Sequence, residues 1–87
     1  MMVEKIKQDI IQIIYNLFND RGFLDDISDY TDLVEDLGMD SMTFVSVIIE
    51  IESKFNIIFS DDMLQIENFK TIEKIVALVQ DICESSQ

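Results

Sequence analysis

The stretch Leu37–Phe59, LGMDSMTFVSVIIEIESKFNIIF, sets the fold because a turn signal leads directly into a long apolar pattern. Gly38 frees the backbone for a turn, and Asp40 is a residue type that caps helix starts. Apolar residues then recur at helical spacing, at Val45, Ile48, Ile51 and Phe55. The stretch therefore predicts a helix over about residues 41–54, with Ser41 in its first turn.

Ser41 places a hydroxyl at the start of this predicted helix. The first turn of a helix has backbone N–H groups without intrahelical partners and a partial positive charge. A phosphate attached to such a hydroxyl would be stabilised by ~0.3–1 kcal/mol at an exposed site. Asp-Ser before an apolar run is most often only a helix cap, however, so the dipeptide alone leaves both readings open.

The pattern around Ser41 extends well beyond the dipeptide. Leu-Gly-x-Asp-Ser occupies residues 37–41, and Glu-x-x-Phe-x-Ile follows at Glu52, Phe55 and Ile57. This pattern resembles the acyl carrier protein family over nearly the whole chain. The resemblance implies that a separate phosphopantetheinyl transferase, using coenzyme A, attaches 4′-phosphopantetheine to Ser41 as a phosphodiester. It also implies a carrier that holds acyl intermediates as thioesters on that arm, delivers them to partner enzymes and catalyses nothing itself.

Length and charge limit the possible functions. The 87 residues, 48% of them hydrophobic, predict one small domain that buries ~60% of its unfolded surface. With the resemblance, this is a single carrier domain over residues 1–87. A net charge of −12 argues against binding a nucleic acid backbone. It favours partner enzymes with basic docking surfaces, although acidity also serves simply to keep a domain soluble.

The residue types of the commonest zinc and hydrolase sites are scarce. The chain has no histidine and one cysteine, Cys83, so Cys/His zinc sites and histidine-dependent hydrolysis are not expected. The acidic connection over residues 19–39 fits no EF-hand register, and no metal site is predicted. Charged residues interrupt the apolar residues at the N-terminus. This pattern fits neither a signal peptide nor a membrane span, so a cytoplasmic protein is predicted.

The remaining periodicity predicts an all-α four-helix bundle of the acyl-carrier type, with a long first loop and a short third helix. The first helix is expected over about residues 2–19, with Leu17 in its core stripe and Phe18 at the edge of that stripe. Ser60 is expected to cap the third helix, and Thr71 to begin the last, which packs Cys83. Residues 83–87 are expected to fray. Because the chain starts at Met1 and ends just past the fourth helix, a freestanding carrier is expected.

The long first loop is expected to lie against the bundle through apolar anchors, with a helical turn near Thr31–Glu35. The anchors proposed from the sequence are Phe23, Leu24, Ile27, Tyr30, Leu33 and Leu37.

The predicted helix over residues 41–54 carries two apolar lines. Val47, Ile48, Ile51 and Phe55 can point inward, while Met42, Val45 and Ile49 form a second line with Phe44 beside it. The second line is either covered by the loop and third helix or exposed as a docking surface. By resemblance to the family, the partner-contact candidates are Met42, Val45 and Ile49, with Asp36 and Asp40 as charged flanks.

The same helix departs from the usual family pattern. Carriers of fatty acid synthesis usually present several acidic residues here, whereas this chain has Thr43, Ser46, Ser53 and Lys54. This difference favours a specialised pathway, such as polyketide, nonribosomal peptide or lipid biosynthesis. The alternatives are a carrier for primary fatty acid synthesis or a small acidic helical adaptor without a prosthetic group.

Overall fold

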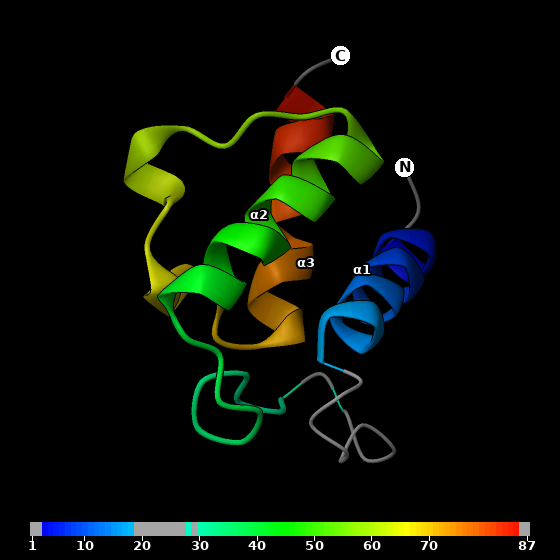
Figure 1. Ribbon diagram of the computed structural model, residues 1–87. Helices are drawn as coiled ribbons and strands as arrows, with labels where there is room; N and C mark the ends of the chain where they lie inside the picture. The colour runs from blue at the N-terminus through cyan, green and yellow to red at the C-terminus, as the bar shows by residue number, and fades with distance from the viewer. Residues whose placement is uncertain (1–2, 19–27, 29, 86–87) are drawn as a thin grey trace.

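The computed structural model describes residues 3–18, 28 and 30–85. Within these residues the chain forms three α-helices and two short 3₁₀ helices, and no strand (Figure 1). In chain order the elements are α1 Val3–Phe18, α2 Ser41–Phe55, η2 Asp61–Met63, η3 Ile66–Phe69 and α3 Ile72–Ser85. The helix α1 contacts both α2 and α3, and α3 also contacts η3. The expected all-helical class is therefore confirmed.

The predicted count of four helices is not confirmed. In place of a third helix, the described chain has η2 and η3, with an extended residue, Gln65, between them (φ −121°, ψ 138°). Ser60 makes no side-chain cap. Its hydroxyl instead donates a hydrogen bond to Asp62 Oδ1 at 2.7 Å, which lowers the pKa of that carboxyl group. The segment is too short for intrinsic helix propensity to decide its shape, so packing decides it.

The buried faces of α1 and α3 supply most of the core. On α1 the prediction reversed two neighbours, because Phe18 is fully buried and Leu17 is only half-buried. Cys83 is buried on α3, as predicted. The helix α3 continues to Ser85, and the fraying of residues 83–87 stays a prediction. The fully or nearly buried side chains of these two helices are Ile6, Ile10, Ile13, Ile14, Phe18, Ile72, Ile75, Val76, Val79 and Cys83.

Phe69 joins the η3 segment to the rest of the molecule. Its ring meets the rings of Phe44 and Phe59 edge to face, with 5.3 Å between centroids in each pair. The next residue, Lys70, accepts a hydrogen bond from Leu33 N–H at 2.6 Å. These contacts tie α2, the connection after it and the first loop to the segment that leads into α3.

The described part of the first loop is held by two of the predicted anchors. Leu33 and Leu37 are buried, but Tyr30 is 74% exposed, so its assignment as an anchor is wrong. Tyr30 lies beside a polar turn in which Ser28 N–H donates to Thr31 Oγ1. The candidate anchors Phe23, Leu24 and Ile27 lie outside the described residues.

The helical turn in this loop falls slightly later than predicted. It is closed by hydrogen bonds from Asp36 N–H to the Asp32 carbonyl (2.7 Å) and from Gly38 N–H to the Val34 carbonyl (3.0 Å).

Among the described helices, none is both long and apolar enough to cross a bilayer.

Replacing Phe69 with alanine tests this packing. The Phe69→Ala variant should lose about 3–5 kcal/mol of unfolding free energy in urea titrations, because it removes a fully buried ring and both edge-to-face contacts. That is a large part of the ~5–15 kcal/mol typical of a small domain. Gln8→Ala on the exposed face of α1 is the control and should change stability by less than ~0.5 kcal/mol. Equal effects of the two changes would contradict this role of Phe69.

Candidate functional site

The start of α2 is fixed by Asp40. This residue has an extended backbone (φ −108°, ψ −175°), and its Oδ1 accepts a hydrogen bond from Thr43 N–H at 2.9 Å. Its carbonyl oxygen accepts the bond from Phe44 N–H at 2.8 Å. The predicted N-cap is therefore confirmed, and Ser41 is the first residue of the helix.

The residues before the cap hold the chain against the core. Leu37 and Met39 are buried on either side of Gly38, whose positive φ of 71° is the conformation that glycine adopts without strain. Met39 N–H also donates to the Leu33 carbonyl at 2.9 Å. Because the chain is anchored up to Met39, the following Asp40 and Ser41 are left at the surface.

Ser41 is exposed and borders a shallow, open depression with a volume of about 420 Å³. The other residues that line this depression are Met42, Val45 and Ser46, and the lining is mostly apolar. The Ser46 hydroxyl donates to the Met42 carbonyl at 3.2 Å, so it is already engaged within the helix. An accessible hydroxyl at a helix start, beside open space, fits the attachment of a phosphate-linked group.

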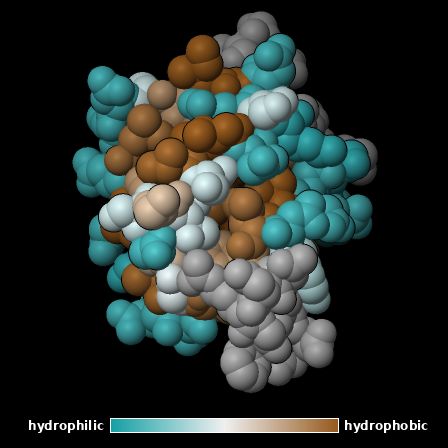
Figure 2. All heavy atoms as spheres, in the orientation of Figure 1, coloured by the Kyte–Doolittle hydropathy of each residue, from teal (hydrophilic) through white to brown (hydrophobic). Residues whose placement is uncertain are grey.

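The two apolar lines of α2 face opposite environments. Val47, Ile48 and Ile51 are buried, whereas Met42, Val45 and Ile49 are 82%, 52% and 58% exposed. Figure 2 shows hydrophobic side chains gathered on the face of the molecule over α2. We call Met42, Val45 and Ile49 the apolar line. The residues that the structure describes leave it exposed, which favours the alternative of a docking surface.

The two charged flanks are at the surface and also have structural contacts. Asp40 caps α2, and Asp36 Oδ2 accepts a hydrogen bond from Asp32 N–H at 3.1 Å. Farther along α2, Glu50 is exposed, whereas the Glu52 carboxylate accepts a hydrogen bond from Phe59 N–H. Exposed carboxylates therefore flank the start of α2, and the Glu52 carboxylate is engaged with the backbone after the helix.

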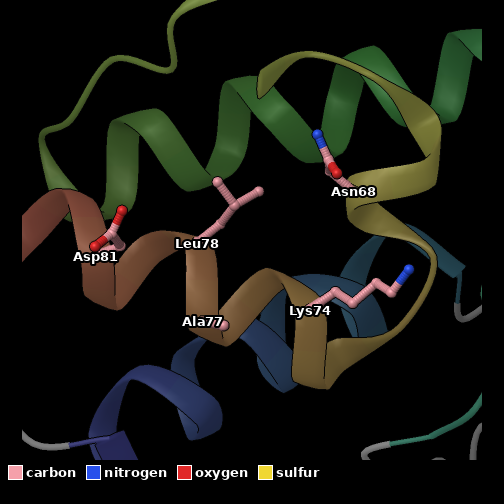
Figure 3. A pocket seen from close by; sticks show the side chains of 5 residues that line it. All are labelled: Asn68, Lys74, Ala77, Leu78 and Asp81. Carbon is pink, nitrogen blue, oxygen red and sulfur yellow. The ribbon is translucent and has the colours of Figure 1, made fainter. Parts of the chain in front are cut away.

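A larger depression, of about 480 Å³, lies elsewhere, between η3 and α3 (Figure 3). Its lining residues are Asn68, Lys74, Ala77, Leu78 and Asp81. The Asn68 amide donates to the Met63 carbonyl, and Lys74 Nζ donates to the Glu67 carbonyl at 3.4 Å. These polar groups hold the 3₁₀ segments in place, and Ser41 is not part of this lining. We therefore place the candidate site at the start of α2.

Two residues of interest, one on α2 and one just after it, were not identified from the sequence. Ser46 lines the depression beside Ser41, and Ile58 is highly exposed after the end of α2. In the sequence, Ile57-Ile58-Phe59 looks like one continuous apolar run. The only signal for Ile58 is the alternation around it, because Ile57 and Phe59 are both buried.

Comparisons with known proteins point to one family. Residues 23–79 match the family described as "Phosphopantetheine attachment site". The chain is 41% identical over 76 residues to an acyl carrier protein of Aster yellows witches'-broom phytoplasma, covering 87% of this chain and 90% of that protein. It is 30% identical over 76 residues to one from Coprothermobacter proteolyticus, covering 85% and 90%. A third, from Phytoplasma australiense, is 44% identical over 46 residues, where the match spans 53% of this chain and 58% of that protein.

Changing Asp40 separates its role as a cap from its charge. The Asp40→Ala variant should lose about 1 kcal/mol of unfolding free energy, because Thr43 N–H loses its acceptor. Asp40→Asn keeps a capping oxygen and should retain most of that stability. Urea unfolding of both variants measures the difference. If the asparagine variant were as unstable as the alanine variant, the cap would not be the source of the effect.

Proposed function

The chain belongs to the acyl carrier protein family, whose members are carriers and not catalysts, and we propose that Ser41 is the residue to which its 4′-phosphopantetheine is attached. The observation that carries this proposal is the exposed Ser41 hydroxyl in the first turn of α2. It is the serine of the Leu-Gly-x-Asp-Ser sequence and lies inside the matched residues 23–79.

The position of Ser41 suits the phosphodiester that the modification forms. The backbone N–H groups of the first turn and the helix dipole favour an anion there by ~0.3–1 kcal/mol. The Asp40 carboxylate accepts the Thr43 N–H, and the chain has no histidine. We therefore assign the base that removes the Ser41 proton to the transferase.

The chain contributes a support for the arm but no reacting thiol. When bound, 4′-phosphopantetheine supplies a terminal thiol that holds an acyl group as a thioester. Cys83 is unsuited to that chemistry because it is buried on the core face of α3. The flexible arm starts at an exposed residue, so its far end can enter the active sites of separate partner enzymes.

We assign partner contact to the apolar line, with Asp36 and Asp40 as the charged flanks. The proposed partners are the phosphopantetheinyl transferase and the enzymes that load, process and release the acyl group. Exposed carboxylates at the Ser41 end favour basic surfaces on these partners. Docking through a small surface is expected to be brief, which a carrier needs when it visits several enzymes in turn.

The chemistry of α2 also favours a specialised biosynthetic pathway over primary fatty acid synthesis. It has Thr43, Ser46, Ser53 and Lys54 at positions where carriers of fatty acid synthesis usually present acidic residues, and Glu52 is turned toward Phe59. A docking surface of this kind selects partners by shape and apolar contact. We expect a dedicated set of partner enzymes, in the cytoplasm. The adaptor alternative shares this surface but requires no modification of Ser41.

Intact-mass measurement tests the attachment directly. Incubation with a broad-specificity phosphopantetheinyl transferase and coenzyme A should add one phosphopantetheine group to the wild-type chain. Ser41→Ala should abolish the addition, while Ser46→Ala, which removes the neighbouring hydroxyl in the same depression, should not. An unchanged mass for the wild type would support the adaptor. Addition to Ser41→Ala would place the attachment elsewhere.

Charge-removing variants test the flanks. The double variant Asp36→Asn with Asp40→Asn keeps both hydrogen-bond acceptors and should slow modification about three- to tenfold at low salt, because it weakens attraction to a basic partner. The difference from wild type should shrink at high salt. Glu73→Gln with Asp81→Asn, an equal charge change on α3, is the matched control. Equal slowing by both pairs would show that only net charge matters.

A further inference from the structure

Ile58 is the most exposed of the large hydrophobic side chains that the structure describes, at 83%. Single exposed hydrophobic residues are common and need no explanation. Ile58 differs because the backbone on both sides of it is anchored, which keeps its side chain at the surface.

Both neighbours of Ile58 are hydrogen-bonded to one residue, Glu52 of α2. Ile57 N–H donates to the Glu52 carbonyl at 3.1 Å, and Phe59 N–H donates to Glu52 Oε2 at 3.0 Å. The side chains of Ile57 and Phe59 are buried. With both flanking side chains directed inward and their N–H groups bonded to Glu52, the Ile58 side chain is held outward.

Glu52 also relates Ile58 to the apolar line. Val45, Ile49 and Glu52 are spaced by four and three residues, so they follow one another along the same side of α2. Glu52 therefore occupies the next position of the stripe, and its carboxylate is turned to the backbone beside Ile58. The hydrogen bond from Phe59 N–H to the Glu52 carboxylate therefore places Ile58 beside Glu52. Ile58 adds an exposed apolar side chain after Ile49, at the end of α2 where the helix itself has a carboxylate.

We propose that Ile58, held by Glu52, extends the apolar line and contacts an apolar patch on the transferase that modifies Ser41. This inference rests on the proposed function. Glu52 lies about 16 Å along the helix axis from Ser41, at the ~1.5 Å rise per residue of an α-helix. A typical interface covers ~800 Å² on each partner, which is large enough for one enzyme to contact both Ser41 and Ile58. In this role Glu52 is a positioning residue.

The partner is a different protein rather than a second copy of this chain. The chain carries a net charge of −12, and carboxylates of Asp36 and Asp40 lie beside the Ser41 end of the surface. Two copies meeting face to face would bring these like charges together. A transferase with an apolar patch and basic residues around it is complementary to the whole surface.

Kinetics of Ser41 modification test the contact. We expect Ile58→Ser to lower kcat/KM for a broad-specificity transferase with coenzyme A about three- to tenfold, mainly through KM, because an apolar contact is lost. The loss should be similar at about 0.05 M and 0.5 M NaCl, since it is not electrostatic. Ile49→Ser is the positive comparison and Ala77→Ser, exposed on α3, is the matched control. Urea unfolding of each variant verifies that the fold is retained, and Ile58→Ala is the second variant at this position.

The outcomes separate the contact of Ile58 from the carrier function on which it rests. If wild type is modified and Ile58→Ser behaves as Ala77→Ser does, the contact of Ile58 is wrong while the carrier function stands. If wild type is not modified at all, the proposed function itself fails, and the contact with it. A wild-type dimer in sedimentation experiments that Ile58→Ser converts to monomer would assign the surface to self-association and overturn the proposal.

Variants of Glu52 test its positioning role. Glu52→Ala should reduce kcat/KM to about the level of Ile58→Ser, because Phe59 N–H loses its acceptor, while Glu52→Gln retains an acceptor oxygen and should restore most of the rate. On the Ile58→Ser background, Glu52→Ala should have little further effect. An additive effect in this double variant would show that Glu52 contacts the partner itself and would overturn the positioning role.

Discussion

The hydrogen bond from Thr43 N–H to the Asp40 carboxylate determines where α2 begins, and the position of the site depends on it. The cap ends the extended backbone at Asp40 and makes Ser41 the first residue of the helix. Packing of Val47, Ile48 and Ile51 in the core holds the inward side of α2, while Ser41 stays exposed. The cap and the core together therefore place the Ser41 hydroxyl at an accessible helix start.

The two sides of α2 do different work in this structure. Burial of one line contributes to stability, at roughly 1.5–3 kcal/mol for each fully buried large aliphatic side chain. The apolar line does not contribute this stabilisation, since Met42, Val45 and Ile49 stay in contact with water. A small domain can tolerate this loss because α1 and α3 supply a nearly continuous buried face. The uncovered line is then available for brief contacts with other proteins, which a carrier requires.

Local signals in the sequence were sufficient to predict the start of α2. Gly38, Asp40 and the apolar periodicity act within a few residues, and the structure has the predicted turn, cap and helix. The segment after α2 was predicted as a short third helix capped by Ser60, from the type of residue at its start. Its actual form depends on the contacts of Phe69 with Phe44 and Phe59, which are distant in sequence. Ile58 was missed for a similar reason, because its exposure depends on the bonds between Glu52 and the residues around it.

Peptide mapping of the protein isolated from its own host tests the central claim, that Ser41 bears the prosthetic group, most directly. Proteolysis followed by tandem mass spectrometry should find phosphopantetheine, free or acylated, on the peptide that contains Ser41, and fragmentation should assign it to that hydroxyl. The acyl group on the arm would also identify the cargo. If the Ser41 peptide were always recovered unmodified, or if the group were attached to another residue, the proposed attachment would be contradicted.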